Sequence, residues 1–196
     1  MSSKPTLIGL VGRKGSGKDT AAVKLMEEGY ANEKFAGALK EMIRCLLAYQ
    51  GVEASVIERM IEGDLKEEPT KYLAGQTPRH AMQTLGTEWG RKLMADTLWI
   101  DVTMTRVAGR KVVLTDVRFP NEVEAVERAG GIPIGITAEW VKPVEGEHES
   151  ERLIDDIIAS LPEYQKVTNR SAKSGESVRD VIAEFQTRFL LLLAKL

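Results

Sequence analysis

Short apolar runs separated by longer polar segments set the pattern of this chain. Residues 6–11, 111–115 and 132–137 are largely apolar and are bounded by charged or turn-forming residues. Runs of this length predict strands that are buried on both faces, as in a parallel sheet. Weaker signals predict a short strand at residues 34–36 and another around Val167.

Helical periods fill the segments between these runs. Apolar residues spaced three and four apart predict helices over residues 19–28, 38–49 and 178–193, and a further helix from Pro120 to the pair Gly130-Gly131. Thr77 and Pro78 supply a capping hydroxyl and a proline at the first helical position, so another helix is predicted to begin there. Residues 51–76 are charged and weakly periodic, which predicts a helical excursion followed by a mobile loop.

The same periods predict which side chains of these helices are buried. In the helix over residues 38–49 the predicted core side comprises Leu39, Met42, Ile43, Leu46 and Leu47. After Thr77 an apolar stripe, most simply core, comprises Met82, Leu85, Trp89 and Leu93. In the last helix the positions at core spacing are Val178, Val181, Ile182, Phe185 and Phe189.

Strands that alternate with helices predict an α/β fold in which helices flank a central, mostly parallel sheet. The length of 196 residues and the hydrophobic content of 43% suit a single domain over residues 1–196. Within it, we expect a helical insertion around residues 38–108. The charged stretch around residues 145–156 is a candidate lid.

Charge and cysteine content narrow the classes of ligand and compartment. A net charge of -2 gives no general field for holding polyanions, so phosphate recognition must come from local basic groups, and a small phosphorylated ligand fits best. The single Cys45 excludes an internal disulfide framework and is expected to be a buried thiol in a reduced compartment. No apolar run has the length of a membrane span, so we expect a cytoplasmic protein that does not bind a membrane.

The stretch GRKGSGKDT lies between the first predicted strand and the helix after it. Strand, glycine-rich loop and helix are the context of a phosphate-binding P-loop, whose backbone wraps around phosphates while the lysine reaches the β- and γ-phosphates. The motif expects a hydroxyl directly after the lysine to help hold magnesium, but Asp19 stands there, and this carboxylate either replaces the hydroxyl or breaks the site. The alternative to a P-loop is a glycine-rich turn with a solvated lysine. The candidate nucleotide-binding residues are Gly12, Lys14, Gly15, Ser16, Gly17, Lys18, Asp19 and Thr20.

A second acidic position follows the strand over residues 111–115. Asp116 lies at the carboxyl end of this strand, where P-loop proteins carry an acid that contacts the metal directly or through water. Its alternative is a turn residue at a strand end. Arg118, Asn121 and Glu122 follow at the same predicted edge, where open α/β folds bind ligands. No guanine-reading N-K-x-D motif is present, which argues against a GTPase switch.

The segment TPRHAMQTLGTEWGRKL presents a second helical face. At helical spacing this face carries Arg79, Gln83, Gly86 and Gly90. Because glycines inside a helix cost about 1 kcal/mol each relative to alanine, their presence indicates close approach by either a packed neighbour or a flat ligand. In the candidate lid, Arg152 is either a lid arginine or part of a solvated helix face, while His148 is expected to be a surface histidine.

Taken in order, GRKGSGKDT, FAGALK, TPRHAMQTLGTEWGR, VVLTDVRFPNEVEAVERAGG, HESE and VTNR resemble the bacteriophage deoxynucleoside monophosphate kinase family. The match spans almost the whole chain, and Asp-Thr after the P-loop lysine is common in that family. FAGALK departs from the more usual FADPLK, with Gly37 and Ala38 in place of Asp and Pro. The resemblance implies a P-loop NTPase-type three-layer fold and transfer of the ATP γ-phosphoryl group to a deoxynucleoside 5′-monophosphate.

The resemblance also implies roles for individual residues. It assigns residues 12–20 to ATP and Mg²⁺, Lys18 to transition-state charge, and Asp19 and Asp116 to the metal. It implies that the helical insertion binds the substrate. The contacts with the acceptor nucleotide are expected at Arg79, Gln83, Arg118 and Glu122. The catalytic set is Lys18, Asp116, Arg118 and Arg152, while Asn169 lies in the region that flanks adenine in related kinases.

Two other functions fit parts of the sequence. A related phage kinase phosphorylates hydroxymethylated bases in DNA, but the lack of a basic run argues against a nucleic-acid partner. A non-catalytic module whose bound ATP controls a partner protein would need only the P-loop. The expected partner is therefore a deoxynucleoside monophosphate, in the host cytoplasm if the chain is phage-encoded, and a homodimer is compatible with the sequence.

Overall fold

The computed structural model describes residues 5–142, 149–174 and 176–196, and the chain divides into two compact units. One unit comprises Met1–Lys34 and Val107–Leu196 and contains the sheet; we call it the sheet unit. The other, Phe35–Arg106, is built from helices; we call it the helical unit. Its bounds lie close to those of the insertion predicted around residues 38–108.

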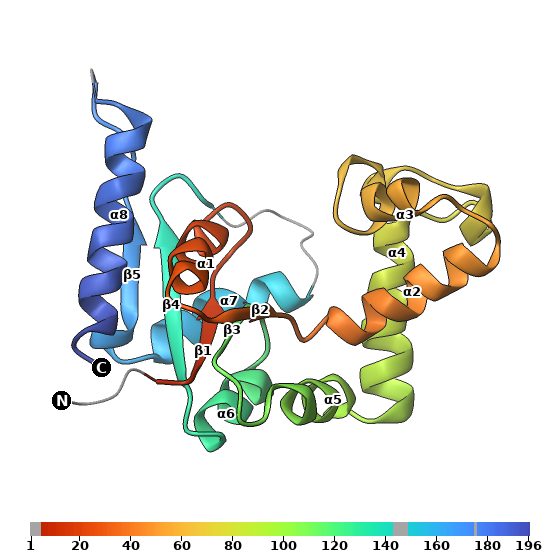
Figure 1. Ribbon diagram of the computed structural model, residues 1–196, viewed down its shortest axis with the longest axis horizontal. Helices are drawn as coiled ribbons and strands as arrows, with labels where there is room; N and C mark the ends of the chain where they lie inside the picture. The colour runs from red at the N-terminus through yellow and green to blue at the C-terminus, as the bar shows by residue number, and fades with distance from the viewer. Residues whose placement is uncertain (1–4, 143–148, 175) are drawn as a thin grey trace. The chain divides into compact units, whose positions relative to one another are not determined.

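The sheet has five parallel strands in the order β2-β3-β1-β4-β5 (Figure 1). The strands are β1 (Leu7–Val11), β2 (Ala31–Glu33), β3 (Val112–Val117), β4 (Ile132–Ala138) and β5 (Lys166–Asn169). This arrangement confirms the predicted α/β fold with a parallel sheet. The prediction of a strand at residues 34–36 is wrong, because β2 ends at Glu33 and the buried side chain of Phe35 belongs to the other unit.

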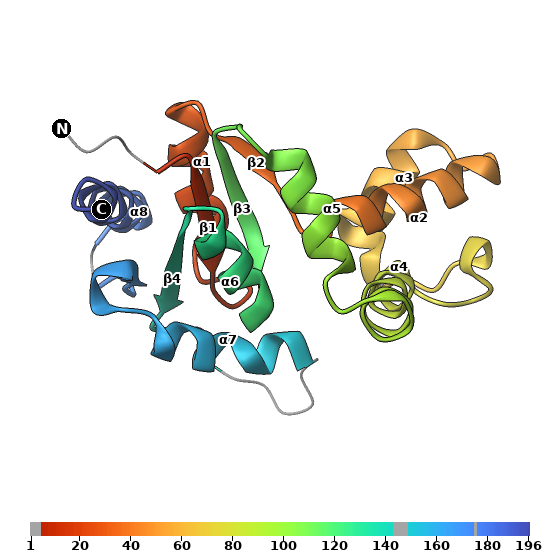
Figure 2. The same cartoon turned by 90° about the horizontal axis from the view of Figure 1, so that it is seen from below.

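Helices cover both faces of the sheet unit and make three layers. On one face, α1 (Lys18–Glu27) and α8 (Val178–Leu193) contact each other and pack on the strands. On the other face, α6 (Pro120–Arg128) and α7 (Glu149–Ser160) contact β1 and β4 (Figure 2). A short 3₁₀ turn, Glu163–Gln165, leads into β5.

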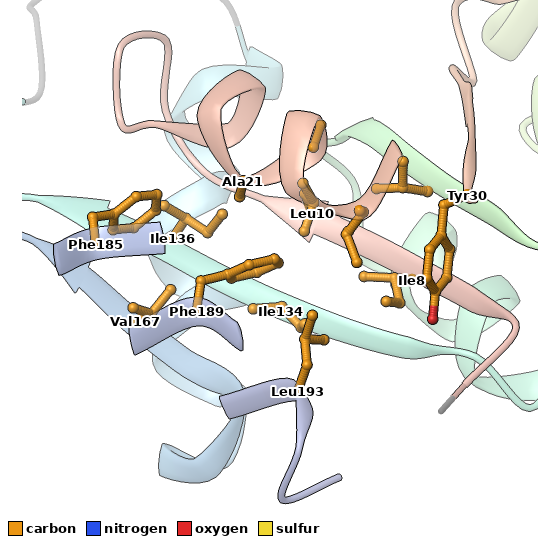
Figure 3. Close-up of a cluster of buried hydrophobic side chains, with 13 residues drawn as sticks. Ile8, Leu10, Ala21, Tyr30, Ile134, Ile136, Val167, Phe185, Phe189 and Leu193 are labelled. Carbon is orange, nitrogen blue, oxygen red and sulfur yellow. The ribbon is translucent and has the colours of Figure 1, made fainter. Parts of the chain in front are cut away.

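The core on the α1 and α8 face explains the strand signals in the sequence. Alternate residues of the central strands, such as Ile134 and Ile136, point toward α8 and meet Phe185 and Phe189 (Figure 3). The positions between them face the other side of the sheet. A Cβ atom at Gly9, for example, would lie 3.1 Å from a methyl group of Val126 in α6. Because both faces are covered, the strands read as continuous apolar runs.

The helical unit consists of short helices around its own core. They are α2 (Gly37–Tyr49), α3 (Ala54–Ile61), α4 (Pro78–Gln83), a π-helix over Thr84–Met94 and α5 (Leu98–Val107), with 3₁₀ turns at Asp64–Glu67 and Lys71–Leu73. Thr77 caps α4 by accepting a hydrogen bond from the backbone N–H of His80, as predicted. The predicted helical excursion within residues 51–76 is confirmed by α3 and the two 3₁₀ turns.

Several predicted core positions in the helices are wrong. Only Leu39, Ile43 and Leu47 of α2 are buried, whereas Met42 and Leu46 are exposed, because residues four apart form a narrower buried stripe than the sequence indicated. Cys45, predicted to be buried, is exposed on the same helix. Leu93 is also exposed, because the i→i+5 bonding of the π-helix changes the spacing on which the α-helical stripe was drawn. In α8, Val178 and Ile182 are exposed.

Candidate active site

The glycine-rich loop connects β1 to α1, as the motif requires. Gly15 and Gly17 have φ angles of 81° and 106°, which other residues rarely adopt. At Gly12, a Cβ atom would lie 2.6 Å from both the carbonyl oxygen of Ile136 and the hydroxyl of Ser16. The backbone therefore forms a tight cradle at the N-terminus of a helix, which is the geometry that suits a phosphate.

Polar groups inside the cradle fit a bound triphosphate. The Nζ atom of Lys18 donates to the backbone carbonyls of Gly12 and Arg13, at 2.5 and 2.8 Å, so its ammonium group lies over the loop. The Ser16 hydroxyl is buried and has no hydrogen-bond partner among the described residues. A buried hydroxyl is usually paired, so this one is suited to a ligand oxygen.

Arg13 anchors the loop to α7 instead of facing solvent. Its guanidinium is largely buried and donates two hydrogen bonds to the carboxylate of Asp155, from Nε at 2.9 Å and from Nη2 at 3.0 Å. A small hollow of about 50 Å³ between the loop, β4 and α7 is lined by both residues and is too small for a nucleotide. The sequence placed Arg13 in the loop but gave no signal for this anchoring contact, because its partner lies 142 residues further along the chain.

The ends of β4 and β5 also meet the loop. Asn169 is the last residue of β5, is buried, and donates from Nδ2 to the carbonyl of Ser16 at 3.4 Å. After β4, Trp140 donates from its indole Nε1 to the carbonyl of Gly15 at 3.3 Å. The sequence placed Asn169 near the nucleotide but gave no signal for Trp140.

The two carboxylates that the sequence predicted to hold a metal are Asp19 and Asp116. Asp19 is exposed in the first turn of α1, followed directly by Thr20. Asp116 lies within β3 and precedes Val117, which pairs with Val11 immediately before the loop. The parallel pairing of β1 and β3 therefore brings Asp116 to the loop, and carboxylate oxygens are ligands that Mg²⁺ accepts. Among the described residues, no group of three or more His, Cys, Asp or Glu side chains is placed so that it could hold a metal ion.

Glu122 organises the turn between β3 and α6. Its carboxylate is buried and accepts hydrogen bonds from the backbone N–H groups of Arg118, at 2.7 Å, and Phe119, at 3.2 Å. An acid in the first turn of a helix satisfies backbone donors that would otherwise be unpaired. This contact orients the backbone of Arg118; acceptor binding by Arg118 and Glu122 stays a prediction.

In the helical unit, the two glycines of the second face lie against packed side chains, Leu39 at Gly86 and Trp99 at Gly90. A Cβ atom at Gly90 would lie 2.4 Å from the indole nitrogen of Trp99, and that nitrogen donates to the carbonyl of Gly86 at 2.8 Å. The close approach predicted at these glycines is therefore made by a packed neighbour. Arg79 forms an ion pair with Glu67, and Gln83 ends α4. Their binding of the acceptor stays a prediction.

The candidate lid around residues 145–156 divides at α7. Arg152 is exposed, but Ile154 is fully buried and Asp155 holds Arg13, so this end of the segment is part of the packed sheet unit. Residues 143–148, with His148, lie outside the described residues. A lid role for Arg152 stays a prediction. No helix in the described ranges is both long and apolar enough to span a bilayer.

Comparisons with known proteins identify relatives that are named as kinases. No family model matches the chain. A protein of Acanthamoeba polyphaga mimivirus, named as a deoxynucleotide monophosphate kinase, is 31% identical over 176 residues, which cover 79% of this chain and 88% of that protein. The deoxynucleoside-5′-monophosphate kinase of Escherichia phage T5 is 31% identical over 84 residues, covering 38% of this chain and 34% of that protein.

Among solved structures, TT1252 from Thermus thermophilus aligns over 96% of this chain and 97% of its own, with a TM-score of 0.44 and 16% identity.

Proposed function

Because the chain belongs to the viral deoxynucleoside monophosphate kinase family, we propose that it transfers the γ-phosphoryl group of ATP to a deoxynucleoside 5′-monophosphate. The products are ADP and the deoxynucleoside diphosphate. The observation that carries the proposal is the P-loop cradle, in which the ammonium group of Lys18 and the buried hydroxyl of Ser16 lie on one tight loop. Such a site binds and neutralises phosphates, which is most of what phosphoryl transfer requires.

Each part of the loop has a task in this reaction. The backbone of residues 12–20 holds the triphosphate, and Lys18 exchanges its carbonyl partners for phosphate oxygens, where its charge stabilises the transition state. Arg13 and Asn169 hold the loop in shape from outside through Asp155 and Ser16. Mg²⁺, held through Asp19 and Asp116, would neutralise charge on the β- and γ-phosphates.

The acceptor is proposed to bind through arginine and amide side chains. Arg118 follows β3 beside Asp116, and its backbone is held by Glu122, so its side chain starts from a fixed point at the sheet edge. An arginine fork suits the two oxygens of a terminal phosphate. Arg79 and Gln83 are further proposed contacts, contributed by the helical unit, and Arg152 is proposed to contribute charge to the transferred group.

An assay of ADP production tests the proposal against its alternatives. We expect turnover with ATP, Mg²⁺ and at least one member of a panel of deoxynucleoside monophosphates, including hydroxymethylated ones. Turnover only with oligonucleotides that carry hydroxymethylated bases would favour the DNA kinase instead. ATP binding without turnover on either acceptor would favour the regulatory module.

The carboxylate of Asp19 is expected to make ATP binding depend on magnesium. Without the metal this acid repels the triphosphate, since like charges about 4 Å apart in water repel by about 1 kcal/mol. Thr20 does not substitute for it, because one residue along a helix turns a side chain by about 100°. Relative to Asp19→Ser, the natural protein should therefore lose about fivefold more ATP affinity when magnesium is chelated.

Calorimetric titration of ATP into both proteins, with magnesium and with a chelator, measures this difference. Equal metal dependence and equal turnover in the two proteins would make Asp19 only a residue that starts the helix.

A further inference from the structure

Trp140 combines exposure with a fixed position. Its side chain follows β4 in the sheet unit and is 49% exposed, a high value for so large an aromatic residue. Its indole nitrogen donates to the carbonyl of Gly15, at the tip of the P-loop. The adjoining Val141 also approaches that glycine, since a Cβ atom there would lie 3.9 Å from its methyl group. The ring is therefore attached to the loop while much of its surface faces solvent.

The loop that carries Trp140 is joined to the segment after β5. The backbone N–H of Glu139 donates to the carbonyl of Asn169 at 3.1 Å, and the Glu139 carboxylate accepts from the backbone N–H of Ser171 at 2.9 Å. The neighbouring Arg170 is paired with Glu176 and holds the pKa of that carboxyl at about 2 by donating hydrogen bonds to it. Residues 139–141 and 169–171 thus form one connected rim beside the P-loop.

The order of the strands places this rim at the nucleoside end of a bound triphosphate. This step rests on the proposed function, in which Asp116 would hold the metal that neutralises charge on the β- and γ-phosphates. Asp116 lies on β3, and β3 and β4 flank β1 on opposite sides. The γ-phosphate therefore lies toward β3, and the α-phosphate with its nucleoside leaves the P-loop toward β4 and β5, where Trp140 stands.

We propose that Trp140 stacks on the base of the phosphoryl donor and thereby selects purine nucleotides. The only polar atom of the indole is engaged with Gly15, so the ring offers a flat apolar face and no group that reads the edge of a base. Stacking tolerates any base because every base has a π face, and a purine covers more of the ring than a pyrimidine. ATP, dATP and GTP are accordingly accepted as donors in preference to CTP and UTP.

Removal of the ring distinguishes stacking from support of the loop. Trp140→Ala is expected to weaken binding of ATP about five- to fiftyfold, to leave binding of inorganic tripolyphosphate within twofold, and to reduce the preference for purine donors. Trp140→Phe should keep most of the affinity, because it keeps an aromatic face without the indole nitrogen. Tyr164→Ala is the matched control, since Tyr164 is another exposed aromatic side chain of the sheet unit, on the 3₁₀ turn before β5.

Calorimetry with ATP and with tripolyphosphate, followed by KM and kcat for the donor panel, measures these effects. Equal loss of both ligands in Trp140→Ala would overturn the proposal and make Trp140 a support for Gly15. Unchanged ATP binding would overturn it as well, while leaving the proposed kinase function intact. If the natural protein bound neither ATP nor tripolyphosphate, the proposed function itself would fail, and the inference with it.

Discussion

Replacing Lys18 with methionine is expected to lower kcat by about 10²–10³-fold, the usual cost of losing one preorganised group that stabilises transition-state charge. The ammonium group lies over the P-loop, within 2.8 Å of the carbonyl of Arg13, so it is positioned before any nucleotide arrives. Methionine keeps the length and apolar stem of the side chain and removes the charge. ATP affinity should fall less than kcat, because the developing charge in the transition state gains most from the lysine.

Single-turnover rates with saturating ATP, together with thermal unfolding, separate catalysis from folding in this variant. Lys24→Met is the matched control: Lys24 lies later on the same helix and pairs with Glu27 at the surface. A Lys18→Met protein that folds normally and keeps near-normal kcat would contradict the proposed role of the loop in phosphoryl transfer.

Replacing Asp116 with asparagine is expected to lower kcat by about 10²-fold and to raise the concentration of Mg²⁺ needed for half-maximal rate. The substitution preserves shape at a half-buried position of β3 and removes the negative charge that suits a hard cation. Metal ions contribute several kcal/mol to such transition states, so weakening one ligand has a large effect.

The rate measured over a range of Mg²⁺ concentrations tests this role. Asp180→Asn is the control, because Asp180 is an exposed acid in the first turn of α8. An unchanged Mg²⁺ requirement in Asp116→Asn, even with a lower rate, would assign Asp116 to orientation of the acceptor rather than to the metal.

Local patterns in the sequence were sufficient to predict most of the fold. The apolar runs identified β1, β3 and β4, because strands buried on both faces need apolar residues at every position. The P-loop was recognisable because its glycines, lysine and following helix are contiguous. The family resemblance is confirmed by the mimivirus relative, which is similar over most of both chains. Helix starts at Pro78 and Pro120 followed from capping chemistry that acts within one turn.

Predictions of burial were wrong where a helical period was used without knowledge of what packs against the helix. Met42 and Leu46 are apolar and correctly spaced, yet only one narrow side of α2 meets the core of its unit. Gly86 and Gly90 indicated close approach correctly, but the sequence did not distinguish a ligand from the packed side chains of Leu39 and Trp99. The sequence assigned Glu122 to the acceptor, which stays a prediction, but gave no sign that its carboxylate also accepts hydrogen bonds from two backbone N–H groups. The residue type determines which interactions a side chain can make, and its neighbours in the fold determine which of these it does make.

By itself, the sequence determined the strand-loop-helix of the P-loop, the α/β class and the family, since these depend on contiguous residues. Only the tertiary structure decided that Arg13 is held by Asp155, that Asn169 contacts Ser16 and that Trp140 is fixed to Gly15. The partners in these pairs come from segments that are far apart along the chain. Asn169 and Trp140 reach the P-loop because the carboxyl ends of parallel strands lie at one edge of the sheet, and Asp155 reaches it because α7 packs on that sheet. A hydrophobic pattern predicts burial without identifying the partner.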